Sequence, residues 1–141
     1  MKILKFVIVF VLVSTGISSF SSTVDDTQTR KTGSFHAVKV STGIDLYLQL
    51  GNSEEVIVEA NEDIIDDLIT ETDNGVLKIY MKKNLNWNWN KTRKVYVTAK
   101  ELDLIDASSG SDVESKGTLQ CQTLKIDASS GSDIDLELNV N

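Results

Sequence analysis

The sequence predicts an all-β, parallel β-solenoid-like domain with one short helix, after an N-terminal signal peptide. Three observations support this fold class. A nine-residue segment occurs twice at a spacing of 21 residues, apolar and polar side chains alternate over most of the chain, and the N-terminus is first basic and then apolar. A fixed period of this length is typical of stacked structural units, each of which buries an apolar edge against the next.

The N-terminus has the order of a secretory signal peptide. Lys2 and Lys5 precede an apolar run over residues 6–13, and small polar residues follow. The run is shorter than the roughly 20 apolar residues that span a bilayer. Cleavage near residues 19–22 is therefore favoured over a retained anchor, and no transmembrane segment is expected in the mature chain. This divides the chain into a signal peptide (1–21), a polar linker (22–32) and a single β domain (33–141).

Strands with one buried and one solvated face are predicted from period-two alternation. The alternating apolar positions are Val38 and Val40; Ile44, Leu46, Leu48 and Leu50; Val56 and Val58; Leu77, Ile79 and Met81; and Val95 and Val97. Turns between these strands are expected at Thr42-Gly43, Gly51-Asn52 and Asp73-Asn74-Gly75.

Residues 61–69 break this alternation. Ile64, Ile65, Leu68 and Ile69 have helical spacing, and Asn61 can cap a helix whose first turn is acidic. The segment predicts one helix of about two turns. Its acidic residues are assigned to the helix start and to solubility, with a cation site as the alternative.

The two copies of the repeat, residues 105–113 and 126–134, predict successive coils. Each copy has a strand that ends in Ala107 or Ala128, a Ser-Ser-Gly-Ser corner, and a strand that opens with Val113 or Ile134. Small residues suit a corner where neighbouring backbones approach closely. The corner residues with an expected structural role are Ser109, Gly110, Asp112, Ser130, Gly131 and Asp133. An antiparallel stack of hairpins is the alternative geometry.

Charge and cysteine content limit the partners and the compartment. Without Lys2 and Lys5, 12 basic residues stand against 21 acidic ones. A chain this acidic repels nucleic acid and anionic lipid, so neither is an expected partner. Cys121 is the only cysteine, so no intrachain disulfide forms, and its sequence neighbourhood favours a small, inert core residue. An exported chain without a disulfide fits a bacterial envelope.

Sequence signals for catalysis or for a metal are weak. His36 is the only histidine and is in phase with Val38 and Val40, which favours a half-buried structural residue. The repeat places aspartates every 21 residues with one glycine per copy, whereas calcium β-rolls repeat about every nine residues. Corner capping is therefore preferred for these aspartates, with a weak metal site as the alternative. No catalytic residue, cofactor or metal is predicted.

The strongest candidate for a recognition surface is an Asn-rich segment that holds both tryptophans. Trp87 and Trp89 alternate with Asn86 and Asn88, so an extended backbone would project the rings and the amides on opposite sides. Trp faces beside amides can stack on sugar rings and bind their hydroxyls. The alternative is a hairpin whose tryptophans cover the core of the first sheet.

The order of motifs over residues 33–141 resembles the putative auto-transporter adhesin head GIN domain family of exported bacterial proteins. The motifs that carry the resemblance are Gly33-Ser34-Phe35-x-x-Val38-x-Val40, Gly43-Ile44-Asp45-Leu46-Tyr47-Leu48, Val56-x-Val58-x-Ala60-Asn61-Glu62, Gly75-Val76-Leu77-x-Ile79 and the Ser-Gly-Ser-Asp repeats. The resemblance implies a right-handed parallel β-solenoid or β-helix-like domain outside the cytoplasm of a Gram-negative bacterium, in the periplasm or at the outer surface. It implies no catalytic residue.

The combined expectation is a non-enzymatic, adhesin-like binding module of the cell envelope, with a glycan or an envelope protein as its partner. One alternative is a structural protein that self-associates through its C-terminal edge, where an apolar strand ends without a polar cap. This ending also fits a domain truncated at its C-terminus. A less favoured alternative is a hydrolase of envelope glycans that uses carboxylates such as Asp45 or Asp106, which requires two carboxyl groups about 5–10 Å apart in a cleft.

Overall fold

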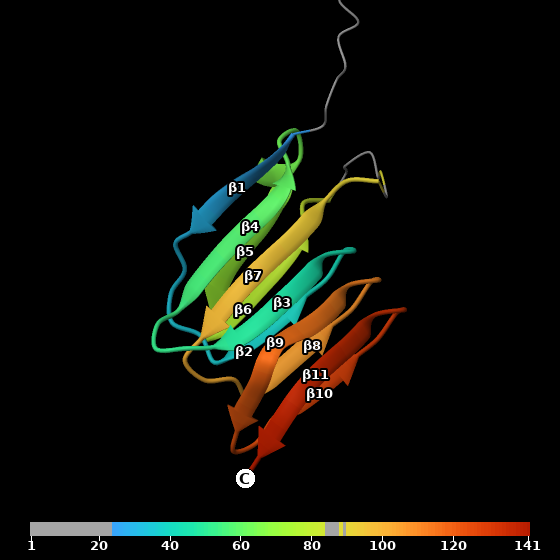
Figure 1. Ribbon diagram of the computed structural model, residues 1–141. Helices are drawn as coiled ribbons and strands as arrows, with labels where there is room; N and C mark the ends of the chain where they lie inside the picture. The colour runs from blue at the N-terminus through green and yellow to red at the C-terminus, as the bar shows by residue number, and fades with distance from the viewer. Residues whose placement is uncertain (1–23, 84–87, 89) are drawn as a thin grey trace, which may run out of the picture.

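Two β-sheets pack face to face in the computed structural model, which describes residues 24–83, 88 and 90–141 (Figure 1). The predicted signal peptide lies outside these residues. Sheet A contains, in spatial order, β1 (Asp25–Arg30), β4 (Glu55–Asn61), β7 (Arg93–Ala99), β3 (Asp45–Leu50), β9 (Asp112–Cys121) and β11 (Asp133–Val140). Sheet B contains β10 (Lys125–Ala128), β8 (Leu104–Ala107), β2 (Ala37–Val40), β6 (Val76–Met81) and β5 (Leu68–Asp73).

Both sheets are mixed, and the prediction of a right-handed parallel β-solenoid is wrong. Strands β1, β4 and β7 pair antiparallel in sheet A, and β5 pairs antiparallel with β6 in sheet B. The turn between β5 and β6 has positive φ at both Asn74 and Gly75, which is the backbone of a tight hairpin. Because hairpin pairing interrupts the winding between β3 and β8, the chain forms two open sheets and no closed solenoid.

Parallel pairing joins β7 to β3 and β6 to β2, and it continues through the remaining strands. These remaining strands form three stacked layers, each with one strand from each sheet. The first layer is β2 with β3, the second is β8 with β9, and the third is β10 with β11. The two copies of the repeat pair in parallel and in register, with Ala128 opposite Ala107 and Ile134 opposite Val113. The alternative of an antiparallel stack of hairpins is therefore excluded for the repeats.

The Ser-Ser-Gly-Ser segments connect the two sheets within the second and third layers. Ser109 and Gly110 both have positive φ, and the Ser111 N–H donates to the Ser108 carbonyl at 3.3 Å, as in a type I′ turn. Ser130 and Gly131 repeat this geometry one layer on, and the Gly110 N–H donates to the Ser130 carbonyl at 3.1 Å. The corners thus carry hydrogen bonds between layers as well as within them.

The core lies between the sheets and receives the inward side chains of each layer. The largest fully buried side chains include Ile44, Leu46, Leu48, Leu77, Ile79, Ile105 and Leu119. Burial decreases at the third layer: Leu119 of β9 is fully buried, whereas its in-register neighbour Leu138 of β11 is 39% exposed. The described residues cover the second layer on both sides and the third on only one.

The predicted helix over residues 61–69 is replaced by a single 3-10 turn, η1 (Ile65–Asp67), and the described residues contain no α-helix. Asn61 belongs to β4 and does not cap the turn. Its amide donates to Asp25 at 2.8 Å and accepts the Thr92 N–H at 2.8 Å. Leu68 begins β5 and pairs with Met81. The apolar residues of this segment are buried by strand pairing, which overrides the helical spacing.

Strand β1 lies within residues 22–32, where the sequence predicts a polar linker. Residues Asp25–Arg30 form the outer edge of sheet A and are mostly exposed, so the strand has no alternation of buried apolar side chains that the sequence could reveal. The Arg30 guanidinium donates to the carbonyls of Ile65 at 2.8 Å and Leu68 at 3.1 Å. This side chain thereby connects the edge of sheet A to sheet B and closes this end of the core.

His36 lies immediately before β2 and is not part of a strand. Its side chain is 46% exposed, and its Nδ1 lies 2.9 Å from the Asp103 carboxylate. The ring rests against Gly75, where an added Cβ would lie 2.6 Å from Nε2. The hydrogen bond and the charge of Asp103 raise the pKa of His36, with a smaller contribution from Glu101.

We predict that the second layer contributes more to stability than the third. Leu119→Ala removes a fully buried side chain, so the free energy of unfolding should fall by about 2–5 kcal/mol. Leu138→Ala, at the in-register position of β11, should lower it by about 1 kcal/mol or less. Urea unfolding followed by circular dichroism compares the two variants, and equal losses would contradict the layer-by-layer account of burial.

We also predict that the contact between His36 and Asp103 stabilises the fold most when His36 is protonated. Its folded pKa is raised, so the stabilising contribution is fully present below the unfolded pKa and is lost as the pH rises through the folded pKa. NMR titration should place the pKa of His36 above about 6.5, and Asp103→Asn should lower it. Asp127→Asn, which lies on a different layer, is the control. An unchanged His36 pKa in Asp103→Asn would refute the role of this pair.

Candidate functional site

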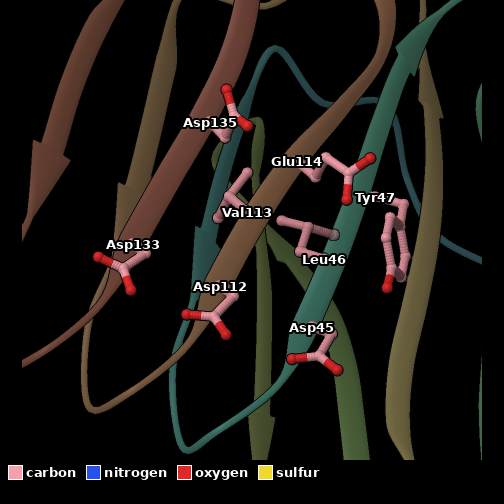
Figure 2. A pocket seen from close by; sticks show the side chains of 8 residues that line it. All are labelled: Asp45, Leu46, Tyr47, Asp112, Val113, Glu114, Asp133 and Asp135. Carbon is pink, nitrogen blue, oxygen red and sulfur yellow. The ribbon is translucent and has the colours of Figure 1, made fainter.

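A row of three aspartates crosses the outer face of sheet A. Asp133, Asp112 and Asp45 open β11, β9 and β3, and each pairs in register with the next. Neighbouring strands lie about 4.8 Å apart, so the row places like charges side by side. Figure 2 shows the three carboxylates directed away from the sheet, in this order across the strands.

A second row runs parallel to the first, two residues further along the strands. It consists of Asp135, Glu114, Tyr47 and Tyr96 in register. The rings of Tyr47 and Tyr96 stack with centroids 5.1 Å apart and planes at 17°. The Lys116 ammonium lies 4.6 Å from the centre of the Tyr47 ring.

The two rows enclose an open depression of about 270 Å³ (Figure 2). The residues that line it are Asp45, Leu46, Tyr47, Asp112, Val113, Glu114, Asp133 and Asp135. Leu46 and Val113 point into the core, so the surface presented to solvent is formed by carboxylates and one phenol ring. Such a surface accepts hydrogen bonds from hydroxyl and ammonium groups.

Asp45 has the most perturbed environment of these carboxylates. Partial burial raises the pKa of Asp45, and the neighbouring charge of Asp112 raises it further. Lys94, which pairs in register with Asp45, and Arg93 act in the opposite direction. Asp45 is thus the point where the acidic row meets the basic end of β7.

A second depression, of about 340 Å³, lies on the basic side of Asp45. Its lining residues are Gly43, Asp45, Asn90, Lys91, Thr92, Arg93, Lys94 and Gly110. The buried Arg93 guanidinium donates to the carbonyls of Asn88 at 2.7 Å and Lys91 at 3.3 Å. Arg93 therefore holds the end of the Asn-rich segment beside the corner that carries Gly110.

The predicted recognition residues Trp87, Trp89 and Asn86 lie outside the residues that the structure describes. Asn88 is exposed, and its side-chain oxygen accepts the Asn90 N–H at 3.0 Å. The described part of the Asn-rich segment therefore adjoins the second depression.

The residues predicted as repeat corners divide into two groups. Ser109, Gly110, Ser130 and Gly131 form the turns themselves, whereas Asp112 and Asp133 stand on the outer face of sheet A. The capping hydrogen bonds come from serines: the Ser132 hydroxyl accepts the Ser129 N–H at 3.0 Å, and the Ser111 hydroxyl accepts the Ile44 N–H at 3.3 Å.

Sequence reasoning missed that Asp45 belongs to the same row. The signal was present, because Thr42-Gly43-Ile44-Asp45 places a glycine two residues before an aspartate, as both copies of the repeat do. Thr42 and Gly43 also have positive φ, as in the other two corners. The first layer is thus a third, weaker copy of the repeat.

The described part of the chain gives little evidence of a metal site or of an activated cysteine nucleophile. It contains no group of three or more His, Cys, Asp and Glu side chains placed to hold a metal ion. His36 and Cys121 line one depression of about 460 Å³. Burial raises the pKa of the Cys121 thiol, and a raised pKa disfavours the reactive thiolate. The buried position of Cys121 agrees with its predicted place in the core.

The carboxylates named for a hydrolase lie on opposite sheets. Asp45 has Asp112 as its in-register neighbour on the open face of sheet A. Asp106 is in sheet B, where the Lys39 ammonium lies 3.4 Å from it. Asp45 and Asp112 are close, but the face on which they stand is not a cleft that would enclose a scissile bond.

Comparisons with solved structures identify the fold. A “putative adhesin” from Bacteroides fragilis superposes with a TM-score of 0.75 at 17% identity, over 84% of this chain and 56% of that one. A “putative adhesin” from Parabacteroides merdae gives 0.68 at 20% identity, over 82% and 52%. A “putative lipid binding protein” from Parabacteroides distasonis gives 0.65 at 18% identity, over 83% and 60%. The chain thus spans little more than half the length of these structures.

Sequence comparison identifies the family. No curated protein matches the sequence. No helix among the described residues has both the length and the apolar character needed to cross a membrane. A model of the family described as “Putative auto-transporter adhesin, head GIN domain” matches residues 34–141, the whole of the two-sheet domain apart from β1. The chain therefore belongs to this family, and the family's description as an adhesin points to an exported or surface protein.

Proposed function

We propose that the protein is a non-enzymatic binding module that acts outside the cytoplasm and contacts a glycan through the face of sheet A around Asp45. The observation that carries this proposal is the position of Asp45 in both depressions of that face. On one side of Asp45 lies the acidic row, and on the other lie Arg93 and Lys94. A ligand on this face meets hydrogen-bond acceptors and donors along one continuous surface.

The chemistry of this surface suits a neutral, hydroxyl-rich ligand. Carboxylates accept hydrogen bonds from sugar hydroxyls, and lysine and arginine donate to hydroxyl and ring oxygens. The face is open and shallow, which accommodates an extended chain of sugars better than a small molecule enclosed on all sides. The family to which the chain belongs is named for adhesion, which is a binding function.

The Asn-rich segment extends the proposed surface. Its described end, at Asn90 and Lys91, lines the depression next to Asp45. Trp87 and Trp89 precede this end by a few residues in the sequence. Aromatic rings at this edge would add stacking on sugar faces to the hydrogen bonds that the carboxylates provide.

Catalysis is the less favoured interpretation of the same carboxylates. Asp45 and Asp112 are in-register neighbours on an open face, so water reaches both of them and any bound sugar. Glycoside hydrolysis needs two carboxyl groups on opposite sides of the scissile bond. Two carboxylates that project in the same direction from one sheet contact a ligand from a single side.

We predict that Asp45→Asn combined with Asp112→Asn lowers retention on a glycan array by about tenfold or more, because hydrogen bonds to charged groups are lost. The matched control is Asp106→Asn with Asp127→Asn, an in-register pair on sheet B with the same change in charge. Trp87→Ala with Trp89→Ala tests the Asn-rich segment on the same array. Retention that is equal in the Asp45/Asp112 variant and its control would refute the proposed surface, provided that circular dichroism shows both variants to be folded.

A further inference from the structure

Two aromatic rings stand side by side on the outer face of sheet A. Tyr47 of β3 pairs in register with Tyr96 of β7, and the ring centroids are 5.1 Å apart with the planes at 17°. This separation is close to the spacing of about 4.8 Å between neighbouring strands. The rings therefore stand upright on the sheet, and their faces are directed from one strand toward the next.

The neighbouring strands leave one ring face beside the acidic depression. Ile57 of β4 lies in register on the far side of Tyr96, and the Tyr96 phenol donates to the Glu59 carboxylate at 2.9 Å. Tyr96 covers one face of Tyr47. The other face of Tyr47 is directed toward β9, where Glu114 is its in-register neighbour and both residues line the depression of about 270 Å³ (Figure 2). An aromatic ring face therefore forms one wall of a depression whose polar groups are mainly carboxylates.

The Lys116 side chain covers this ring face. Its ammonium lies 4.6 Å from the centre of the Tyr47 ring and 2.8 Å from the Glu114 carboxylate. Because β9 and β7 lie on opposite sides of β3, Lys116 and Tyr96 contact opposite faces of Tyr47. The Tyr47 ring is thus held between a second ring and a cation.

An irregularity in β9 places the lysine there. Three residues of β9, Ser115–Gly117, lie opposite the single residue Leu136 of β11. The pairing of β9 with β3 ends at Ser115, and Gly117 has a φ of +83°. β-Bulges are frequent beside functional sites, where they redirect a side chain. Because Lys116 lies beyond the paired part of β3, its side chain can move without breaking the sheet.

The interactions that hold Lys116 over the ring are weak. The side chains of Lys116 and Glu114 are 49% and 51% exposed. Exposed ion pairs and exposed cation–π contacts contribute little, because water and salt screen them. A neutral group that packs closely against the ring can therefore replace the ammonium.

The wall formed by Tyr47 matches one side of a hexose. A hexose ring carries C–H groups on its faces and hydroxyl groups at its rim. The C–H face packs against an aromatic ring, and carboxylates such as those of Asp112 and Glu114 accept hydrogen bonds from the hydroxyls. A hexose in this position and the Lys116 ammonium exclude one another, because both need the same face of Tyr47.

We propose that Tyr47 is the aromatic subsite for a neutral hexose unit, and that Lys116 is a displaceable cover that lowers the affinity of this subsite. The sugar packs on the ring face from which the ammonium departs. The hexose unit belongs to the glycan proposed above, so this inference rests on the proposed function and adds to it the residue that opposes binding.

The test of the aromatic subsite uses an array of neutral oligosaccharides of glucose, galactose and mannose. We expect Tyr47→Leu to lower retention about fivefold or more, because the ring face is lost while an apolar side chain remains. The matched control is Tyr80→Leu, which removes a tyrosine of β6 in sheet B and should leave retention unchanged. Circular dichroism checks that both variants are folded. Equal retention of wild type and Tyr47→Leu would overturn the inference.

Lys116→Ala tests the cover, and its expected effect has the opposite sign. Loss of the ammonium opens the ring face, so retention on the same array should rise about threefold or more. Lys116→Arg keeps a cation over the ring and should bind no better than wild type. The matched control is Lys125→Ala, because Lys125 forms an ion pair with Asp127, two residues away, as Lys116 does with Glu114. This control makes the same change in net charge on sheet B and should leave retention unchanged.

Two results on this array would overturn the role of Lys116. Retention that falls in Lys116→Ala would show that the ammonium itself contacts the sugar. An equal rise in Lys116→Ala and Lys125→Ala would assign the effect to net charge.

NMR follows the displacement directly. In the free protein, the ring current of Tyr47 should shift the ε-methylene protons of Lys116 upfield of those of Lys125, and Tyr47→Leu should abolish this shift. Titration with the oligosaccharide that the array retains should move the Lys116 signals toward the position of the Lys125 signals. Lys116 signals that stay upfield at saturation would overturn the inference.

The same array separates this inference from the proposed function. If Asp45→Asn with Asp112→Asn lowers retention while Tyr47→Leu and Lys116→Ala match wild type, the glycan surface stands and the inference fails. If the array retains no wild-type protein, the proposed function fails and the inference fails with it.

Discussion

The burial of each layer by the next is the interaction on which the rest of this structure depends. A single layer of this domain is two short strands joined by a corner, and one face of its apolar residues remains uncovered until another layer stacks upon it. In-register pairing of Ala128 with Ala107 and of Ile134 with Val113 brings successive layers into contact. The corners add a second set of contacts, since the Gly110 N–H reaches the carbonyl of the next corner at Ser130. Positive φ at Gly110 and Gly131 permits that approach.

Stacking also explains the chemistry of the outer face. Residues at equivalent positions of successive layers are neighbours in space, so a repeat that carries one aspartate produces a row of aspartates. Asp45, Asp112 and Asp133 are close for this reason alone. Partial burial is the main cause of the raised pKa of Asp45, and the charge of the neighbouring Asp112 adds to it. On one side the row ends at Lys94 of β7, which lies in register between Asp45 of β3 and Glu59 of β4. Across the outer face of sheet A, the row therefore changes from basic at Lys94 to acidic at Asp45, Asp112 and Asp133.

The sequence allowed the repeats and the alternating strands to be predicted, because both are local patterns. The parallel pairing of residues 105–113 with 126–134 follows from their identity, and the buried positions Val38, Leu46 and Val97 follow from alternation. The mixed sheets could not be predicted in the same way, since the partner of a strand depends on pairing between distant segments. Strand β1 was missed because its residues Asp25–Arg30 are polar and owe their extended state to β4. The segment at residues 61–69 was assigned to a helix because its isoleucines have helical spacing, but strand pairing at Leu68 decides its conformation.

The candidate site shows the same limit. Asp112 and Asp133 were identified by their place in the repeat, yet their position on the outer face depends on the register of β9 and β11. Asp45 was not grouped with them, because the first layer shares only a glycine and an aspartate with the repeat. The exposed Ile126, Leu138 and Val140 belong to the third layer, which the described residues cover on only one side.

Amide hydrogen exchange measured by NMR tests the layered account most directly. If each layer is stabilised by the next, amides of the second layer should exchange slowly, with free energies of opening near that of global unfolding. The amides of Leu136 and Leu138, on the open side of β11, should exchange much faster than those of Val113 and Leu119. Equal protection of β9 and β11 would show that the third layer is already covered and would contradict the account.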